Sequence, residues 1–442
     1  MAENTAGVAR YFASPGWKYE PMSDGASNFE IVVVGAGPAG LSAACVAAES
    51  GKRVAVVDDT PWLGGQIWRG EQARAKQPQA QQWLQRFRKC GVIVLDRTSV
   101  IAAPTNGVLL AERASEPREI HWEKLIVATG ARELFLPFPG WTLPGVIGPG
   151  GLQALVKNGW PIDGRRVVVC GTGPLLLAVA KGLRDHGAKI VSIAEQAPLG
   201  RVMEFGLTLL RHPGKIIQSA GLMAGLMGVR FRCGVWPVKA EGQDSLQRVT
   251  LTDGRKTWTE ECDFLACGFH LVPNVELPLA LGCELQNGFV LVDDWQATSA
   301  ANVFCVGEPT GIGGVDCALT EGQIAGFAAS GQKERAQALF RERAVWHSFR
   351  VALARTYALR EELRTLADDE TLLCRCEDVA LGRTKQFSGW REAKLLSRCG
   401  MGACQGRVCG AAAKFVLGWG MESVRPPVLP ARVGSLVTTN DN

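Results

Sequence analysis

Two stretches of the chain place apolar runs, glycine-rich turns and helical segments in the same order. The first, Phe29 to Asp59, opens with IVVVG, passes through GAGPAG into an alanine-rich segment, and ends in VAVVDD. The second, Arg165 to Glu195, repeats this order with RRVVVCG, GTGPLL and KIVSIAE. Short apolar runs bounded by turn residues favour buried parallel strands. Each stretch therefore predicts a βαβ unit, and the chain an α/β fold with two dinucleotide-binding domains.

The first turn has the glycine spacing of a dinucleotide-binding fingerprint, in the strand–turn–helix context that the fingerprint requires. Gly35 allows the tight turn, Gly37 lets the backbone approach a pyrophosphate, and Gly40 lets the helix pack closely on the strand. The helix that begins at Pro38 and Ala39 offers free N–H groups and a partial positive charge to phosphates. We expect a nucleotide here.

The acid after the second strand and three later segments decide which nucleotide is expected. Asp58, with Asp59 beside it, can bind ribose hydroxyls. The segments WLGGQIWRG (62–70), KLIVATGARE (124–133) and NVFCVGEPTGIGGVDCALTEGQIAG (302–326) follow in order. They resemble the recurring segments of two-dinucleotide-domain flavoproteins, the glutathione reductase and thioredoxin reductase class. The resemblance implies FAD at the first turn.

Further flavin contacts are implied by the same resemblance. Glu308 follows a glycine where the class usually has Asp, and the helix that begins near Asp316 would aim its N-terminus at the flavin ring, favouring an anionic reduced flavin. The implied contact residues beyond the first turn are Gly64, Gly65, Gln66, Val100, Ala128, Thr129, Gly130, Gly307 and Glu308.

The second turn departs from the fingerprint at one position. Gly171 and Gly173 fit, but Leu176 stands where the third glycine belongs and is expected to distort the pyrophosphate seat. Glu195 would select a free 2′-hydroxyl, and so NAD over NADP, if a dinucleotide binds. Three interpretations remain open: a working NAD site, an idle domain, or a seat for another adenine nucleotide.

Composition and missing motifs narrow the function. The net charge is +5 with both signs interspersed, which argues against nucleic-acid binding. No signal peptide and no membrane-spanning run is recognisable, so we expect a cytoplasmic location. None of the fourteen cysteines forms a Cys-x-x-Cys pair, which would accept electrons from a flavin in thioredoxin reductase. No histidine has a recognisable catalytic setting, so we assign no catalytic residue.

Five cysteines gather near the C-terminus, in LLCRCED (372–378) and SRCGMGACQGRVCG (397–410). This density indicates a metal-ligand set. Zinc and an iron–sulfur cluster both accept four thiolates, and the ligands alone do not separate them. A flavin without a disulfide partner favours a redox-active metal.

The pattern CRCE…GMGxCQGRxC, together with PGWTLPGV (139–146) and RPPVLP (425–430), resembles the flavoprotein α subunits of bacterial multi-subunit amine dehydrogenases. That family includes opine oxidases, D-hydroxyproline dehydrogenase and hydrogen cyanide synthase. The last part of this chain, which holds the five cysteines, resembles the bacterioferritin-associated ferredoxin module. This resemblance implies a [2Fe-2S] cluster. The implied ligands are Cys374, Cys376, Cys404 and Cys409, with Cys399 as a non-ligand neighbour.

The resemblance implies a role in electron transfer within a larger enzyme. A partner β subunit would oxidise the amine at its own FAD, and further implied components are an interface FMN and a small third subunit. The rival enzyme hypothesis is a self-contained NADH-dependent flavin/iron–sulfur reductase, which needs a working second turn. A third hypothesis is a flavin-bearing scaffold without turnover. The amine and the electron acceptor are not readable from this chain.

The domain organisation follows from these motifs. The second βαβ unit stands between the ATG and VGE segments, so it interrupts the FAD-binding domain. The expected parts are an N-terminal extension (1–28), a split FAD-binding domain (29–145 and 289–334), an inserted NAD-like domain (146–288), a helical connector (335–368), a [2Fe-2S] domain (369–420) and an extended tail (421–442).

Overall fold

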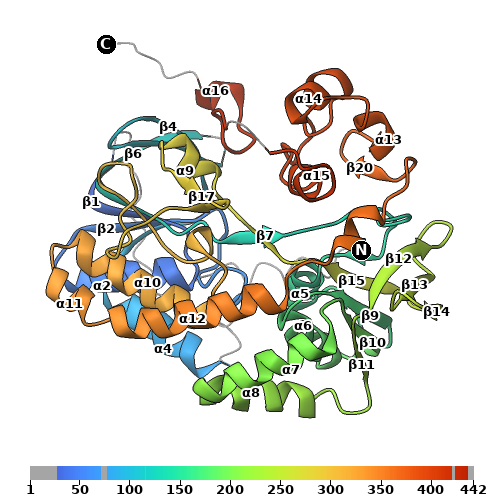
Figure 1. The fold of residues 1–442 in the computed structure, drawn as a ribbon. Helices are drawn as coiled ribbons and strands as arrows, with labels where there is room; N and C mark the ends of the chain where they lie inside the picture. The colour runs from blue at the N-terminus through green and yellow to red at the C-terminus, as the bar shows by residue number, and fades with distance from the viewer. Residues whose placement is uncertain (1–26, 71–76, 115, 421–423, 437–442) are drawn as a thin grey trace, which may run out of the picture. The chain divides into compact units, whose positions relative to one another are not determined.

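The computed structural model describes residues 27–70, 77–114, 116–420 and 424–436. The chain forms two compact units and passes between them more than once (Figure 1). Unit 1 is Met1–Ala131, Pro273–Arg350 and Ser423–Asn442, and unit 2 is Arg132–Val272 and Val351–Glu422. The cysteine-rich segment therefore falls in the same unit as the second βαβ stretch.

Unit 1 is built on a seven-stranded sheet in the order β3-β2-β1-β6-β5-β4, with β19 paired to β6. β1, β2, β3, β6 and β19 run parallel, whereas β5 is antiparallel to both β6 and β4. The strands are β1 (Ser27–Val34), β2 (Val54–Val57), β3 (Ile93–Leu95), β4 (Thr98–Thr105), β5 (Val108–Arg113), β6 (Glu116–Val127) and β19 (Val303–Cys305), with a hairpin of β17 (Leu285–Gln286) and β18 (Phe289–Val290).

The helices of unit 1 include two whose small residues allow close packing. A Cβ on Gly322 would lie 2.2 Å from the Ala39 carbonyl oxygen, so helix α10 approaches helix α2 backbone to backbone. The helices are α2 (Pro38–Glu49), α4 (Pro78–Lys89), α9 (Glu276–Ala280), α10 (Gly314–Ala329), α11 (Lys333–Gln337) and α16 (Val433–Leu436), with the 3₁₀ turn η2 (Glu308–Thr310). Helix α12 (Phe340–Thr356) continues from unit 1 into unit 2.

Unit 2 holds a five-stranded parallel sheet, β11-β10-β9-β15-β8, and an antiparallel sheet, β12-β13-β14. Its strands are β8 (Val146–Ile147), β9 (Arg166–Gly171), β10 (Lys189–Glu195), β11 (Arg230–Cys233), β12 (Trp236–Glu241), β13 (Arg248–Thr252), β14 (Thr257–Glu261) and β15 (Phe264–Gly268). Its helices are α5 (Pro149–Lys157), α6 (Leu175–Arg184), α7 (Leu199–Thr208) and α8 (Pro213–Ala224), with the 3₁₀ turn η1 (Leu209–Arg211). The linker strands β7 (Ala131–Glu133) and β16 (Leu271–Pro273) pair with each other.

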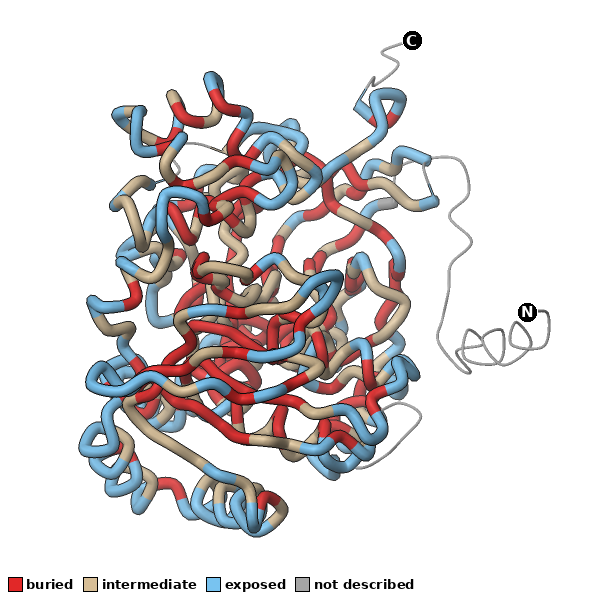
Figure 2. Tube along the Cα trace, turned by 90° about the vertical axis from the view of Figure 1, so that its right-hand side faces the viewer, coloured by how far each residue is buried: buried red, intermediate tan, exposed pale blue. Residues whose placement is uncertain are grey.

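The C-terminal part of unit 2 is a small module with its own core, in which Leu373, Val379 and Trp390 pack with three cysteines. It contains η3 (Glu361–Thr365), the hairpin of β20 (Leu372–Cys374) and β21 (Val379–Ala380), α13 (Leu381–Thr384), α14 (Trp390–Ser397) and α15 (Cys409–Leu417). Buried residues follow the parallel strands of the two larger sheets, as the apolar runs predicted. Figure 2 shows the buried residues gathered inside the molecule and the exposed ones around its edge. None of the helices in the described ranges has the length and apolar character needed to cross a bilayer.

Candidate functional site

The three glycines of the first turn meet three different surroundings. Gly35 has φ +107°, and a Cβ there would lie 2.2 Å from the Ala128 carbonyl oxygen. A Cβ on Gly40 would lie 1.8 Å from the Gly35 carbonyl oxygen. Gly37 has φ −72° and open space beside its Cα, at the N-cap of α2. The first and third glycines thus shape the turn, and the second leaves its outer face open.

The acid after β2 is tied to this turn. The Asp58 carboxylate accepts hydrogen bonds from the Ala36 N–H at 2.7 Å, the Thr60 N–H at 2.8 Å and the Thr60 hydroxyl at 2.7 Å. Asp58 remains partly accessible, and its neighbour Asp59 is exposed. The described residues therefore leave part of the Asp58 carboxylate reachable from outside.

Some of the predicted flavin contacts converge on this turn. The Gly64 N–H donates to the Ala36 carbonyl at 2.8 Å, and a Cβ on Gly65 would lie 3.0 Å from the Gly37 Cα. A Cβ on Gly307, which has φ +77°, would lie 3.1 Å from the Ala39 Cβ. Segments from three parts of the sequence thus lie side by side at the start of α2.

The other predicted contacts lie around this centre. Val100 is buried on β4, Gln66 is exposed, and Glu308 opens the turn η2. The turn of Ala128, Thr129 and Gly130 is held by Asn274, whose side-chain amide donates to the Thr129 carbonyl at 2.8 Å and whose N–H donates to the Gly130 carbonyl at 3.0 Å. Sequence reasoning missed Asn274, because nothing in the surrounding residues distinguishes it from an ordinary loop asparagine.

The second turn, in unit 2, has a different conformation. Gly171 matches Gly35, since its φ is +131° and a Cβ would lie 1.7 Å from the Gly268 carbonyl oxygen. Gly173 has φ +99°, unlike Gly37, and helix α6 begins two residues after it. The Leu176 side chain is only 2% exposed and packs in the core of this domain. Leu176 thus fits in the core of a turn whose backbone differs from that of the first turn at Gly173.

Glu195, the acid of this second turn, is enclosed. Its carboxylate accepts hydrogen bonds from the Thr172 hydroxyl at 2.7 Å, the Gly173 N–H at 2.7 Å and the Ala197 N–H at 2.8 Å, and the residue is 2% exposed. Burial raises the pKa of Glu195 to about 7, against the lowering effect of these hydrogen bonds. The backbone amide that a phosphate would use is occupied by the chain's own carboxylate.

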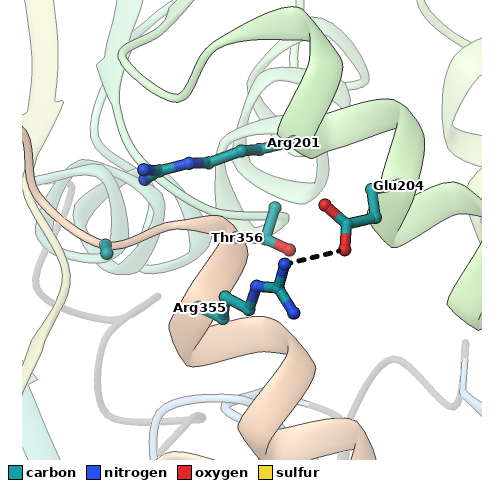
Figure 3. A pocket seen from close by; sticks show the side chains of 5 residues that line it. Arg201, Glu204, Arg355 and Thr356 are labelled. Atoms are coloured by element: carbon teal, nitrogen blue, oxygen red, sulfur yellow. Dashed lines mark ion pairs between the residues drawn. The ribbon is translucent and has the colours of Figure 1, made fainter.

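A cavity in unit 2 lies between helix α7 and the end of helix α12 (Figure 3). Arg201 and Glu204 of α7 line it together with Arg355, Thr356 and Ala358, and Arg355 pairs with Glu204 at 3.2 Å. The residues predicted to hold FAD or metal do not line it. The segment after helix α12 covers the end of β10. Its Ala358 carbonyl accepts a hydrogen bond from the fully buried Gln196 side chain at 3.2 Å.

The five C-terminal cysteines form one contiguous group in the module. The sulfur atoms of Cys374, Cys399 and Cys409 all lie within 4.8 Å of one another, and all three residues are buried. Cys404 contacts Cys409 and Cys376 through thiol hydrogen bonds, and Cys376 is the exposed member. The structure therefore groups two of the predicted ligands, Cys374 and Cys409, with Cys399, which was predicted as a non-ligand neighbour. The choice of Cys376 and Cys404 as the other two ligands stays a prediction.

Mutual hydrogen bonds divide the pKa values of these thiols: those of Cys374 and Cys404 are lowered, whereas those of Cys376, Cys399 and Cys409 are raised. Hydrogen bonds from the Cys399 and Cys409 thiols lower the pKa of Cys374, to which the Gly400 N–H also donates at 3.5 Å. A hydrogen bond from Cys409 lowers the pKa of Cys404 to about 5. Thiolates are the form in which cysteine binds metals. Backbone N–H groups directed at sulfur are typical of thiolate metal sites.

The glycines between these cysteines allow close approaches. A Cβ on Gly400 would lie 2.6 Å from the Trp390 ring, and one on Gly406 would lie 3.0 Å from it. A Cβ on Gly402 would lie 2.5 Å from the Cys376 Cβ. Glycines at these positions therefore allow the loop 400–406 to pack closely on Trp390 and on Cys376.

Residues of β7 and of the segment after it hold the module within unit 2. The Trp141 indole N–H donates to the Leu372 carbonyl at 2.7 Å, two residues before Cys374. The Arg132 side chain donates to the Arg407 carbonyl at 3.0 Å, between the last two cysteines. The Arg375 guanidinium lies 5.7 Å from the Trp141 ring centre. Both cysteine loops thus rest on one segment of the chain.

Two glycine-turn βαβ units, the second in a segment that interrupts the unit of the first, define an α/β flavoprotein fold with two dinucleotide-binding domains. The chain belongs to the family described as pyridine nucleotide-disulphide oxidoreductase, which matches residues 29–322. Two solved structures share the fold. L-proline dehydrogenase from P. horikoshii has a TM-score of 0.63 at 17% identity, covering 94% of this chain and 81% of that one. T. acidophilum thioredoxin reductase has a TM-score of 0.53 at 21% identity, covering 70% of this chain and 99% of that one.

Sequence relatives give a narrower family. The HcnB protein of hydrogen cyanide synthase from Pseudomonas protegens is 30% identical, over 86% of this chain and 89% of its own length. One of the subunits of opine oxidase from Rhizobium meliloti is also 30% identical, over 93% of this chain and 98% of its own length. The resemblance stated above is therefore confirmed, and the chain is a flavoprotein oxidoreductase of this family.

Proposed function

We propose that this chain is the FAD- and [2Fe-2S]-containing electron-transfer subunit of a heteromeric dehydrogenase that oxidises an amine, an opine or an imino acid. The observation that carries the proposal is the buried cysteine group, in a flavoprotein whose sequence has no Cys-x-x-Cys pair. A reduced flavin in such a chain needs another outlet for its electrons.

The residues fit both cofactors. For FAD, the open face of Gly37 and the accessible part of Asp58 match the needs of a pyrophosphate and a ribose. For a [2Fe-2S] cluster, the group supplies at least four thiols, two of which have lowered pKa values. FAD exchanges two electrons, and a [2Fe-2S] cluster passes them singly.

The chain's own residues then have distinct tasks. Gly35 and Gly40 shape the first turn, and Gly64 and Gly307 close against it. In unit 2, Trp141 holds the loop that carries Cys374. The enclosed second turn offers no comparable seat, which argues against the rival NADH-dependent reductase.

A partner protein is part of this proposal. The relatives are named as subunits of larger enzymes. Helices α7 and α8 also expose large apolar side chains, among them Met203, Leu207, Ile217 and Met223. Exposed apolar surface of this kind is typical of interaction sites.

The first test is metal analysis of anaerobically purified full-length chain. We expect about two iron and two sulfide per chain, the content of one [2Fe-2S] cluster, together with one non-covalent FAD. About one zinc without iron or sulfide would overturn the cluster assignment.

The second test resolves the ligand set by serine substitution. Cys404→Ser and Cys376→Ser should abolish the visible absorption of the cluster while FAD stays bound, because the two sites lie in different units. Cys399→Ser is the matched control, and it should leave the cluster in place. A cluster that survives Cys404→Ser but not Cys399→Ser would reverse the assignment of these two thiols.

The third test addresses the partner. A tagged chain purified from its own cells should carry a second flavoprotein, and an amine, opine or imino acid should then reduce the FAD of the complex. Purification of the chain alone, with full reduction by NADH, would support the rival reductase.

A further inference from the structure

A buried carboxylate on α10 organises the turn predicted to meet the flavin. Glu321 is 1% exposed, and its Oε2 accepts a hydrogen bond from the Gly307 N–H at 2.8 Å. The Thr310 hydroxyl lies 3.0 Å from the same oxygen. One carboxylate oxygen thus fixes both ends of the short turn Gly307–Thr310.

The other carboxylate oxygen, Oε1, contacts side chains of helix α12. Its partners there are His347 Nε2 at 3.0 Å and the Arg350 guanidinium at 3.6 Å. His347 and Arg350 are one turn apart and so share a face of α12. Arg350 also donates to the Thr310 carbonyl at 3.2 Å. The helix therefore holds the turn twice, through Glu321 and directly.

A metal site is the competing interpretation, because Cys317, Glu321 and His347 offer ligand atoms within 4.8 Å of one another. The arrangement disfavours it. Arg350 already supplies a positive charge beside this carboxylate, and a second cation there would be repelled. The Gly307 N–H and the Thr310 hydroxyl occupy the remaining oxygen. The cluster is an internal ion-pair and hydrogen-bond network.

Two steric contacts link this network to the first glycine turn. Gly307 lies so close to Ala39, in the first turn of α2, that a Cβ there would lie 3.1 Å from the Ala39 Cβ. At the other end of the turn, a Cβ on Gly311 would lie 2.3 Å from Arg350. A shift of Arg350 or Glu321 would therefore move backbone that borders the pyrophosphate seat.

We propose that His347 and Arg350 are positioning residues of the flavin site, which hold Glu321 so that it fixes the Gly307–Thr310 turn. The inference rests on the proposed binding of FAD at the first turn. Neither residue needs to touch the cofactor. Buried carboxylates that lose a charged partner are strongly destabilised, so the turn should depend on Arg350 most.

The experiment measures the dissociation constant of FAD by flavin fluorescence on the full-length chain. Arg350→Ala should raise this constant at least tenfold, and His347→Leu severalfold. His347→Gln should restore near-normal binding, because the glutamine amide can donate to Glu321 from a similar position. The circular dichroism of the bound flavin in the visible range should change in Arg350→Ala and His347→Leu, and return in His347→Gln.

The matched control is Arg343→Ala on the same helix. Arg343 is also buried and ion-paired, with Asp294 at 2.6 Å, but it does not contact the turn. We expect this substitution to lower the thermal midpoint and leave FAD affinity unchanged. Equal losses of affinity in Arg343→Ala and Arg350→Ala would overturn the inference, as would normal affinity in both Arg350→Ala and His347→Leu. A wild-type chain that binds no FAD would instead refute the proposed function.

Discussion

The first and second glycine turns have the same order of strand, turn, helix and acid, yet the acid of the first turn stays partly accessible and the acid of the second is enclosed. Their first glycines are equivalent, because a Cβ on Gly35 or Gly171 would collide with the carbonyl of a neighbouring strand. The turns part at the second glycine, where φ is −72° at Gly37 and +99° at Gly173. A shared fingerprint therefore secures the fold of the turn without securing its use.

The acids show the same divergence. Asp58 takes the N–H of Ala36 and stays partly accessible, whereas the longer Glu195 reaches the N–H of Gly173 and is enclosed. One methylene group thus moves the carboxylate to the amide at the helix start, which is the position an anion would take. The comparison teaches that an acid after the second strand can bind a ribose or can close its own turn.

The largest predicted effect is at the open turn. Gly37→Val should fold normally, because a Cβ there meets nothing within 4 Å, but the side chain would occupy the space that a pyrophosphate needs. We expect purified protein with essentially no flavin, measured by absorption at 450 nm, roughly the flavin maximum. Gly200→Val is the control, since its Cβ also meets nothing within 4 Å and it lies in unit 2. Full flavin content in Gly37→Val would show that this turn is not the seat.

The closed turn gives the opposite prediction. NADH should leave the absorption of the bound flavin unchanged in an anaerobic titration of the isolated chain, because Glu195 already occupies the amide of Gly173. Fast, stoichiometric bleaching would break the comparison and restore the NADH-dependent reductase. Equilibrium dialysis with NADH separates absent binding from slow hydride transfer.

The shared parts of the two units were predictable because they depend on local patterns. Apolar runs and glycine spacing predicted both βαβ units, and cysteine density predicted that the C-terminal cysteines would lie near one another. The differences between the two turns depend on contacts between residues far apart in the sequence. Leu176 suggested a distorted seat, but the enclosure of Glu195 was not visible in the sequence.

The supports of the site were equally hidden. Glu321 and His347 lie 26 residues apart on different helices, and no motif marks either residue. Cys399 was recognised as a neighbour of the predicted ligands, but its sulfur position depends on how the Gly400–Gly406 loop folds over Trp390. Such contacts follow from packing, which a pattern of residue types does not encode.

A third prediction uses the pH dependence of stability to test the enclosure of Glu195. The folded pKa is about 7 and the unfolded value 4.5, so the folded state favours the neutral acid. The contribution of Glu195 to the free energy of unfolding is therefore full below about pH 4.5. It is lost as pH rises through about 7, by roughly 3 kcal/mol. Glu195→Gln, which mimics the neutral acid, should remove this decline.

The measurement is the difference in thermal midpoint between wild type and Glu195→Gln from pH 5 to pH 8. The midpoint of wild type should fall below that of the variant as pH rises. Nearby groups do not titrate in this range, because burial raises the pKa of Cys233 to about 11 and also raises the pKa of Tyr357. A pH-independent difference would contradict the raised pKa of Glu195 and so its enclosure.

The smallest predicted effect concerns the support that Trp141, elsewhere in unit 2, gives to the cysteine module. Trp141→Phe keeps an aromatic ring but removes the indole donor to the half-buried Leu372 carbonyl, at a cost of about 1.5 kcal/mol. In metal-free protein, reagents reach the buried Cys374, Cys399 and Cys409 only when the module opens. Thiol labelling of these three should therefore accelerate by about tenfold or more. Trp122→Phe is the control, because this buried indole N–H in the described part of unit 1 has no hydrogen-bond acceptor. Equal labelling rates in wild type and Trp141→Phe would show that the module is held by its own core alone.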